Sequence, residues 1–462
     1  MKKAPLLFLL LCSLLLLPQR AHALEGGSAG PRMIGVELAA QAAAVDFSVT
    51  GDYRLTDAAT GRTVAVPGPQ EKWQVRAQGG RLAVFRNGRP VDSVAGPLLV
   101  RESPYRAFVL SGSGTVAERD LDEGAFIVGA DGQVRPLQGD LAGLAAAGAG
   151  GVSPVGGKKG QNLVTLFGGD GSSRYRGSLE IRIGEKGLTV VNRLPLEEYL
   201  YGVVPAEMPA GWPAEALKAQ AVAARSYALA QIKRRGGSPP PADILATQAS
   251  QVYRGYDWET PATNRAVDDT RGVVLTYRGV PAEAYFHCSS GGFTENSEDV
   301  WKNRLDYVRT RPDPFDLNEK HYNWQVSYTK DELIKQLAKK EYQFKDIFDL
   351  TEKERTASGK RVKRLAVSGL DKEGRPATVE IANADEVRIA LGLKSALFTM
   401  TKEFDAQKKL AKATFKGSGW GHGLGMSQYG ALGMARKGYT YQDILKYYYS
   451  GVTIASDYGG QK

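Results

Sequence analysis

The stretch Leu194–Ile232, LPLEEYLYGVVPAEMPAGWPAEALKAQAVAARSYALAQI, predicts two helices with a short connection between them. In its first half, apolar residues recur at helical spacing from Leu196 to Val203 and form one stripe. Pro205 is expected to end this helix, because the residue before a proline is pushed out of the α region. Pro213 suits a first helical turn, and the alanine-rich run behind it favours a second helix to the end of the stretch.

Glu207 lies in the predicted connection, between Pro205 and Pro209 and next to the apolar Ala206 and Met208. We therefore expect this acid in a stiff, extended segment and not inside a helix. Partly apolar surroundings disfavour a charged carboxylate, so Glu207 would keep its proton near neutral pH, as a general acid requires. An ordinary solvated loop glutamate is the alternative that the spacing alone leaves open.

Basic side chains follow on the second predicted helix. Lys218 and Arg225 are seven residues apart, which places them on one face, about two turns apart. Gln220 is close to them in the chain but lies off that face. Such a face beside an acid could receive an anionic or sugar substrate, and a merely solvated basic face is the alternative.

The opening stretch closely resembles the SpoIID/LytB family, the sporulation and amidase-enhancer group. Two later stretches, AYFHCSSGGFTENSEDVW and GSGWGHGLGMSQYGALGMA, are similar to the same family and follow in the right order. The segments that carry the resemblance are 194–209, 212–229, 284–301 and 417–435.

The resemblance implies a peptidoglycan-cleaving lytic transglycosylase, or a relative that assists an amidase. Glu207 matches the family's catalytic acid, and Lys218 and Arg225 match functionally important basic positions on the following helix. The expected partner is the glycan strand of peptidoglycan, and in the second case a cell-wall amidase as well.

Residues 1–23 have the pattern of a secretory signal peptide. Two lysines precede the apolar run Leu6–Leu17, and the cleavage pattern Ala21-His22-Ala23 follows. The run is too short for a normal spanning helix, and no other segment is expected to cross a membrane. We therefore expect a secreted or periplasmic protein of the cell envelope.

Only Cys288 remains after the predicted cleavage. The mature chain then cannot form an internal disulfide, and a cysteine-rich zinc site within one chain is excluded. A metal held by the histidines lacks a ligand-spacing motif, so neither a metal nor a cofactor is expected.

The charge is unevenly spread along the chain, whose formal net charge is +10. Residues 24–150 carry 12 basic and 14 acidic side chains, so the positive excess of the mature chain lies in 151–462. Cell-wall polymers are anionic, and their attraction to this part is plausible on charge alone. Export and the lack of any nucleic-acid motif argue against nucleic acid as the partner.

The length of 462 residues suits two or three domains. In 24–138, short apolar segments alternate with turn pairs such as Asn87-Gly88, which predicts a β-rich N-terminal domain with a targeting, spacing or structural role. Residues 139–160 contain eight glycines and are expected to form a Gly/Ala-rich linker. Residues 161–456 are then the SpoIID/LytB-like catalytic domain, and the whole is an α+β protein with a glycan cleft.

A second group of candidate residues lies at the end of a predicted strand, 282–287. His287 could donate to a sugar hydroxyl or to Glu207, and Ser290 could bind glycan. A Cys288–His287 nucleophile pair is an alternative, but adjacent strand residues point to opposite faces and are poorly placed to act together. The family usually has serine at the cysteine position, which further disfavours a nucleophile.

The third motif has glycine at every second position from 417 to 425, so backbone or ligand can approach closely there. Neither GxGxxG nor the P-loop pattern fits, so nucleotide binding is not expected. Ser427 is placed to cap a helix that begins near Gln428. The resemblance places His422 and Gln428 near the cleft.

The resulting hypothesis is that Glu207 acts first as acid and then as base on the bond between MurNAc and GlcNAc, leaving a 1,6-anhydro end. A hydrolase that adds a second acid, Glu283 or Glu295, is one alternative, because glycoside hydrolysis normally takes two carboxylates. A wall-binding enhancer of an amidase, with no catalysis of its own, is the other.

Overall fold

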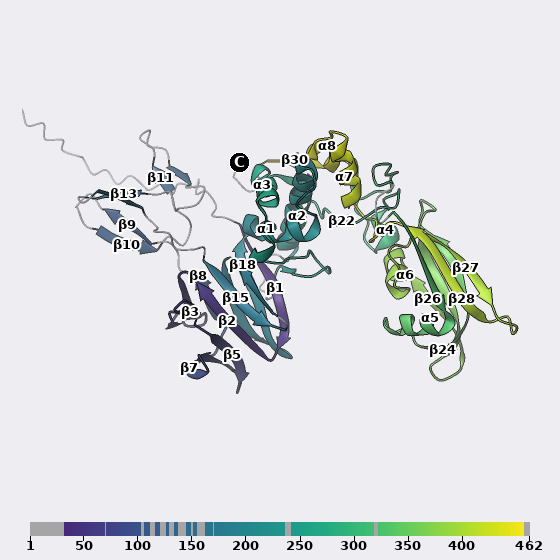
Figure 1. Cartoon of the computed structure of the whole chain (residues 1–462), viewed down its shortest axis with the longest axis horizontal. Helices are drawn as coiled ribbons and strands as arrows, with labels where there is room; N and C mark the ends of the chain where they lie inside the picture. The colour runs from purple at the N-terminus through teal and green to yellow at the C-terminus, as the bar shows by residue number, and fades with distance from the viewer. Residues whose placement is uncertain are drawn as a thin grey trace, which may run out of the picture.

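A computed structural model describes residues 32–456, with gaps at 70, 103–105, 111–115, 121–125, 129–133, 137–144, 149–150, 155–161, 170, 236–241 and 318–321. Between 103 and 161 only the backbone of short strands is described. The predicted signal peptide, 1–23, lies outside the described residues, as does most of the predicted linker. Figure 1 shows three parts in a row: a β part, a helical body, and a lobe that contains the green and yellow-green strands.

The β part consists of two antiparallel sheets packed over one core. The first has the order β19-β1-β18-β17-β8-β3-β4 and the second β16-β15-β2-β5-β6-β7. Their inner faces bury Phe47, Leu55, Trp73 and Ile181 among others, and the alternation of buried and exposed positions along β2 is typical of a half-buried strand. The strands of the first sheet are β1 (Met33–Ala42), β3 (Tyr53–Asp57), β4 (Thr63–Ala65), β8 (Leu98–Glu102), β17 (Ser178–Gly184), β18 (Gly187–Pro195) and β19 (Ile244–Leu245). Those of the second are β2 (Ala44–Thr50), β5 (Trp73–Gln78), β6 (Arg81–Arg86), β7 (Arg89–Val94), β15 (Leu163–Gly168) and β16 (Gly171–Tyr175).

Both sheets contain strands from before and from after the predicted linker. β1 pairs with β18, β8 with β17, and β2 with β15, so strands from 33–102 and from 163–195 share hydrogen bonds. The intervening segment contributes short ladders: β9 (Arg106–Leu110) with β10 (Val116–Asp120), β11 (Phe126–Val128) with β12 (Val134–Pro136), and β13 (Ala145–Gly148) with β14 (Gly151–Pro154). The domain boundaries remain a prediction. Because the strands before 103 and after 161 pair in the same sheets, they belong to one β part, and 103–161 lies between them in the sequence.

The helical body is organised around α2 (Ala214–Arg235). Most of this helix is buried, because α1 (Leu196–Glu207), α3 (Pro261–Asp269), α7 (Gln428–Arg436) and α8 (Tyr441–Tyr448) all pack against it. Alanine at seven buried positions of α2 lets these neighbours approach closely while favouring the helix. The remaining elements of the body are η2 (Tyr256–Trp258), α4 (Ser297–Val300), β20 (Val274–Tyr277), β21 (Val280–Pro281), β22 (Phe286–His287), β29 (Met426–Ser427) and β30 (Thr453–Ala455).

The end of α1 differs from the sequence expectation. The helix runs through Pro205 and ends at Glu207, whereas Pro205 was expected to stop it and to leave Glu207 in an extended connection. Met208 is the first extended residue, with φ −130° and ψ 139°, and it directly precedes Pro209. The stop is therefore set by the second proline, because the restriction on the residue before a proline acts on Met208.

The lobe comprises residues 323–418 and has its own core, which buries Trp324, Leu333, Leu350, Phe398 and Phe415. One sheet has the order β23-β28-β27 and the other β24-β25-β26. Thr329 and Glu332 form a capping box at the start of α5. The lobe contains β23 (Asn323–Thr329), α5 (Lys330–Ala338), β24 (Phe344–Arg355), β25 (Val362–Asp371), β26 (Pro376–Ala382), α6 (Ala384–Ala390), β27 (Phe398–Phe404) and β28 (Leu410–Ser418).

The chain enters and leaves the lobe at one place. Asn323 pairs with Ser418 at the end of the β23–β28 ladder, and the Gly419 N–H donates to the Tyr322 carbonyl at 2.8 Å. Just outside, the second and third motifs meet, because β22 and β29 pair in parallel and set His287 opposite Ser427. The α+β class is confirmed, and among the described helices none is both long and apolar enough to cross a membrane.

Candidate functional site

Glu207 lies at the C-terminal end of α1 with its carboxyl half-buried. One oxygen accepts a hydrogen bond from the Val252 N–H at 2.9 Å, and the other from the Gln428 amide at 3.4 Å. Burial raises the pKa of Glu207, against the opposing effect of these two donors. The expectation that this acid keeps its proton more readily than an ordinary glutamate is therefore supported by its surroundings.

Two glutamine side chains meet beside this carboxyl. The Gln428 amide nitrogen, at the first residue of α7, is 3.4 Å from the Gln220 carbonyl oxygen. Gln220 is fully buried in α2, and its own amide nitrogen has no hydrogen-bond partner among the described residues. A buried donor without a partner is costly, so this nitrogen is a natural contact for a ligand oxygen in the cleft.

Gln428 reaches this position because Ser427 caps α7, as the sequence predicts. The Ser427 hydroxyl accepts a hydrogen bond from the Gly430 N–H at 3.0 Å. Next in α7, the Tyr429 ring packs edge-on against Trp212, with 5.2 Å between ring centroids. Trp212 belongs to the connection that follows Glu207, so the start of α7 and that connection form two sides of the site.

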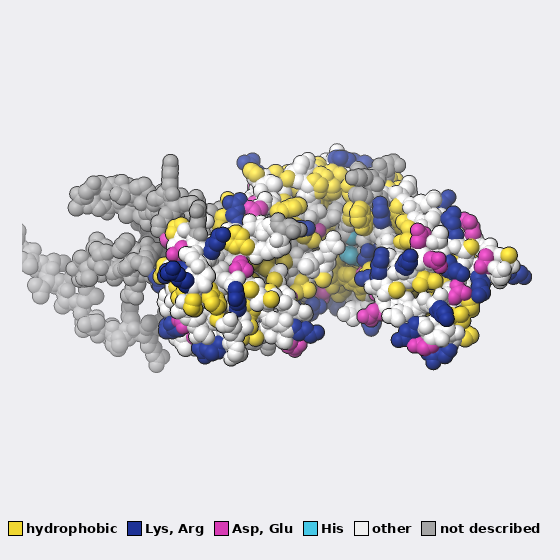
Figure 2. All heavy atoms as spheres, turned by 60° about the horizontal axis from the view of Figure 1, so that its bottom comes forward, with side chains coloured by type: hydrophobic (Ala, Val, Ile, Leu, Met, Phe, Trp, Pro, Cys, Tyr) yellow, Lys and Arg dark blue, Asp and Glu magenta, His cyan; other side chains and the backbone are white. Residues whose placement is uncertain are grey.

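The two predicted histidines lie together, with 5.5 Å between their ring centroids. His287 Nδ1 is 3.0 Å from the Leu424 carbonyl, and its Nε2 is buried without a partner among the described residues. His422 Nδ1 accepts a hydrogen bond from the Leu424 N–H at 3.0 Å, and its ring packs on Trp301 at 5.0 Å. Figure 2 shows histidine side chains at the bottom of a waist between the helical body and the lobe.

Both imidazoles are neutral at pH 7. Burial holds the pKa of His287 well below its usual value, helped by the positive charge of Arg361 and by His422. Burial also lowers the pKa of His422 to about 4, although the nearby Asp385 carboxylate acts in the opposite direction. Neither imidazole is hydrogen-bonded to Glu207 in the described part of the chain, so any joint action would run through a bound substrate.

The glycine spacing of the third motif allows these close contacts. A Cβ at Gly421 would lie 2.9 Å from the His287 Cβ, and one at Gly423 would lie 2.5 Å from the Arg361 guanidinium carbon. Both glycines also have positive φ, which other residues rarely adopt. The predicted close approach is therefore between segments of the protein itself. The third motif packs against the second motif at Gly421 and against the lobe at Gly423.

Arg361 comes from the lobe and is almost fully buried against the second motif. Its guanidinium donates to the Ser290 and Phe293 carbonyls at 2.9 and 2.8 Å and lies 3.7 Å from the Glu295 carboxylate. Nothing in the sequence around Arg361 sets it apart from the lobe's other basic residues. It was missed because its partners lie 66 or more residues earlier in the chain.

Glu283 and Glu295, the candidates for the second carboxylate of a hydrolase, are both hydrogen-bonded to residues other than Glu207. Glu295 is fully buried and accepts hydrogen bonds from the Thr356 and Ser358 hydroxyls, both at 2.7 Å, besides its ion pair with Arg361. Glu283 accepts a hydrogen bond from the Tyr285 hydroxyl. Among the described residues, neither is in hydrogen-bonding contact with Glu207.

Ser290 is placed in the protein interior and not on an open cleft wall. It is fully buried, and its hydroxyl donates to Asp316 at 2.8 Å. Asp316 also accepts from the Ser289 and Ser427 hydroxyls at 2.9 and 3.2 Å and from the Gly291 N–H at 3.1 Å. This carboxylate therefore ties the second motif to the third, a role that sequence reasoning missed.

Lys218 and Arg225 share one face of α2, as predicted, and that face is turned to α3. Arg225 is buried in a two-bond ion pair with Glu197, at 2.7 and 2.8 Å, and donates to the Val267 carbonyl at 3.2 Å. Lys218 lies 3.3 Å from Asp269. Gln220 is about 160° and about 140° around the helix from these two residues, at 100° per residue, so the basic face is turned away from Glu207.

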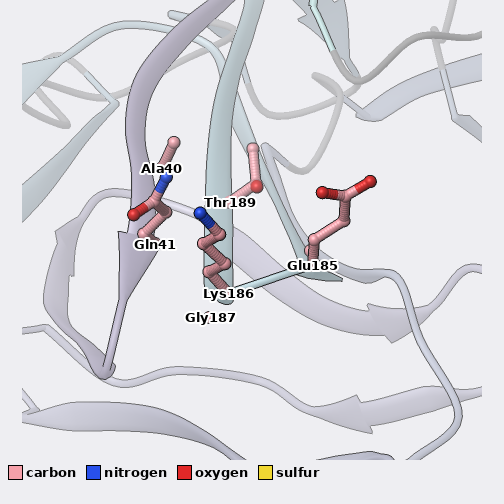
Figure 3. Close-up of a pocket in the computed structure, with 7 residues that line it drawn as sticks. Ala40, Gln41, Glu185, Lys186, Gly187 and Thr189 are labelled. Atoms are coloured by element: carbon pink, nitrogen blue, oxygen red, sulfur yellow. The ribbon is translucent and has the colours of Figure 1, made fainter.

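Cys288 lies near Glu207 but is a poor nucleophile. Burial raises the pKa of its thiol to about 12, helped by the negative charges of Asp316 and Glu207. The thiolate that nucleophilic attack requires is therefore scarce at neutral pH. A hollow of about 260 Å³ at the β17–β18 turn beside Lys186 (Figure 3) contains none of the predicted site residues.

Comparison with known proteins identifies the family of this chain. Residues 184–277 match the family described as Stage II sporulation protein (SpoIID), and residues 296–425 match one described as Domain of unknown function (DUF8618). The chain belongs to the SpoIID family, which confirms the resemblance seen in its motifs.

Among individual relatives, Stage II sporulation protein D of Bacillus subtilis (strain 168) is 34% identical over 278 residues, covering 57% of this chain and 76% of that protein. The Bacillus amyloliquefaciens protein of the same name is 33% identical and covers 57% and 75%. The Amidase enhancer of B. subtilis (strain 168) is 33% identical over 299 residues, covering 56% of this chain and 40% of that protein.

Proposed function

We propose that this protein acts on the cell wall as a lytic transglycosylase of peptidoglycan, outside the cytoplasm, with Glu207 as its general acid and base. The observation that supports this most is a half-buried carboxyl with a raised pKa that has an amide and a backbone N–H beside it and, among the described residues, no second carboxylate in contact. A reaction that uses one carboxylate twice fits such a site, whereas hydrolysis normally takes two.

In the proposed reaction, the protonated Glu207 donates its proton to the glycosidic oxygen as the bond from MurNAc C1 to that oxygen breaks. The resulting carboxylate then removes the proton of the MurNAc 6-hydroxyl as its oxygen bonds to C1. The products are a free hydroxyl on GlcNAc and a 1,6-anhydro MurNAc end, with no water consumed. The raised pKa suits both halves, because more of the acid form is present than for an ordinary glutamate and the acid form is restored at the end of each turn.

Gln220, Gln428, His287 and His422 are proposed to contact the sugars. The Gln220 amide nitrogen and His287 Nε2 are both buried without partners in the described structure, so a ligand oxygen would satisfy them. Neutral imidazoles suit hydrogen bonding to sugar hydroxyls. Lys218, Arg225 and Ser290 are proposed to act indirectly, by fixing α2 against α3 and the second motif against Asp316.

Mass analysis of the products tests the reaction. Glycan strands freed of stem peptides are digested with the protein and with Glu207→Gln, and Glu185→Gln, an exposed acid in the β17–β18 turn, is the matched control. We expect anhydro products, which are lighter by one water, from the native protein and from the control but not from Glu207→Gln. Products that retain the water would contradict the mechanism and favour a hydrolase.

The similarity to the Amidase enhancer supports one alternative, a wall-binding activator. This alternative predicts binding to glycan strands without cleavage, and a faster release of stem peptides when a cell-wall amidase is added. It also predicts that Glu207→Gln enhances as well as the native protein does. Loss of enhancement in that variant would tie any effect on the amidase to glycan cleavage.

A further inference from the structure

Trp420 is a large aromatic side chain left partly open to solvent on a rigid loop. It lies between β28 and β29, and 41% of the residue is exposed. Its backbone is fixed to Ser289 by two hydrogen bonds, of 3.0 Å from the Ser289 N–H and of 2.8 Å from its own N–H. Ser289 is itself buried and bonded to Asp316. An exposed indole on so constrained a backbone offers a pre-organised flat face, which sugar rings can stack on.

A lysine accompanies this ring. The Lys394 ammonium lies 5.1 Å from the Trp420 ring centroid, and the Lys394 carbonyl accepts a hydrogen bond from the Gly421 N–H at 2.8 Å. In the described structure Lys394 has no carboxylate within ion-pair distance, unlike Lys363, Lys402 and Lys409 of the same lobe. A cation without an acidic neighbour, held beside an exposed ring, is available to a negatively charged ligand.

This pair lies on the lobe side of the site that contains Glu207. Trp420 is bridged to Ser289, the residue after Cys288, and the charges of both Lys394 and Glu207 act on the pKa of the Cys288 thiol. In Figure 2, Lys and Arg side chains gather on the wall of the lobe that faces the waist, next to the histidines. A chain of sugars that passes Glu207 and extends towards the lobe would meet this wall.

We propose that Trp420 and Lys394 form a distal subsite for a carboxylate-bearing sugar, in which the indole stacks on a pyranose ring and the ammonium pairs with the carboxylate. The inference rests on the proposed function only for the class of ligand. Two carboxylates in peptidoglycan fit, the lactyl group of MurNAc and the carboxylates of a stem peptide. The lobe then contributes directly to choosing an acidic glycan over a neutral one.

Binding measurements in the Glu207→Gln background test the subsite without cleavage. The probes are glycan strands freed of stem peptides, the same strands with their lactyl carboxylates converted to methylamides, peptide-bearing strands, and neutral chitohexaose, each titrated calorimetrically. We expect Lys394→Gln to weaken binding of a carboxylate-bearing strand roughly threefold to fivefold, the size of an exposed ion pair, and to leave chitohexaose unaffected. Trp420→Ala should weaken all four probes, by about tenfold for a lost stacking partner.

The probes also separate the two sources of charge. A Lys394 effect on freed strands that vanishes after amidation assigns the lactyl group, and an effect seen only with peptide-bearing strands assigns the stem peptide. Lys416→Gln, an exposed lysine on β28, is the matched control and should change nothing. Equal weakening by Lys394→Gln and Lys416→Gln, or no weakening by Lys394→Gln on any acidic probe, would overturn the proposal.

Separate control experiments address folding and catalysis. Trp420→Phe keeps an aromatic face and should retain most binding, and circular dichroism checks that each variant is folded. If the native protein cuts no glycan but Lys394→Gln still weakens acidic strands selectively, the subsite stands and the transglycosylase proposal fails. If cleavage occurs and Lys394→Gln changes neither KM nor binding, the subsite fails and the transglycosylase proposal stands.

Discussion

The carboxyls of Glu207 and Asp316 differ in how completely the hydrogen-bonding groups around them are satisfied. Burial raises the pKa of both acids. Asp316 is fully buried and surrounded by donors, including three serine hydroxyls and the Gly291 N–H. Glu207 is half-buried, accepts two hydrogen bonds, and lies near Gln220, whose amide nitrogen has no hydrogen-bond partner among the described residues. A raised pKa alone therefore does not identify a catalytic acid, and the proposal for Glu207 depends on the unfilled hydrogen-bonding capacity beside it.

The largest expected effect is on catalysis at Glu207. Glu207→Gln keeps the shape of the side chain but removes the proton donor, so we expect glycan cleavage to fall by about 100-fold or more, the usual contribution of general acid–base catalysis. The rate of release of anhydro-ended fragments measures this loss. Retained cleavage would mean that Glu207 is, like Asp316, a structural acid.

The same isosteric change at Asp316 should damage folding instead. Asp316→Asn places an amide N–H₂ against hydroxyl and backbone donors, so at least one buried donor loses its acceptor. We expect a loss of about 2–3 kcal/mol in the free energy of unfolding, the range for a buried hydrogen bond to a charged group. Urea unfolding measures it, and a stable Asp316→Asn with poor catalysis would reverse the assignment of the two acids.

A smaller effect is expected on the pH profile. A general acid must be protonated, so cleavage should decline as the pH rises through the raised pKa of Glu207. The Gln428 amide stabilises the charged form and lowers the pKa of Glu207, so Gln428→Leu should raise that pKa and move the alkaline limb to higher pH. At the optimum we expect about a fivefold change in rate or less, for one long hydrogen bond. An unmoved limb with an unchanged rate would mean that another group controls the profile.

The smallest effect concerns stability at Glu207. An acid whose pKa is raised by folding costs stability once the unfolded chain ionises, so the cost is absent in acid and complete above the folded pKa. Glu207→Gln should therefore melt at a higher temperature than the native protein at pH 8 and at the same temperature near pH 3. Asp316→Asn should melt lower at pH 8. If Glu207→Gln also melts lower there, its carboxylate is as well satisfied as that of Asp316.

Local sequence chemistry predicted much of the site. The helix pair, the cap at Ser427 and a strand that ends at His287 follow from short-range preferences, and the structure confirms them. The strand itself spans only Phe286–His287 and not the predicted 282–287. The family resemblance named Glu207 and Gln428, which the structure brings into contact. The prediction that Pro205 ends α1 was wrong, because Pro205 and Pro209 are both able to stop a helix and the spacing does not show which of them does so.

Interactions between distant segments could not be predicted. Arg225 looked like a substrate contact, but its partner Glu197 lies 28 residues earlier and is brought to it only by the packing of α1 on α2. Ser290 and Asp316 are linked through a loop whose course no periodicity reveals. In each case a polar side chain on a predicted functional segment is bound to another part of the protein, and only the fold shows which.

The chain enters and leaves the lobe at neighbouring residues, and this has an evolutionary consequence. Because Tyr322 and Gly419 are hydrogen-bonded neighbours, a few residues could join them, and an ancestral gene could have gained or exchanged the intervening cassette without rebuilding the remainder. Arg361 shows what such an exchange would have to replace, since its guanidinium anchors the Ser290 and Phe293 carbonyls from within the cassette. Cassettes of different surface chemistry, each with an equivalent anchor, would let the same Glu207 site act on cell walls of different composition if the proposed activity holds.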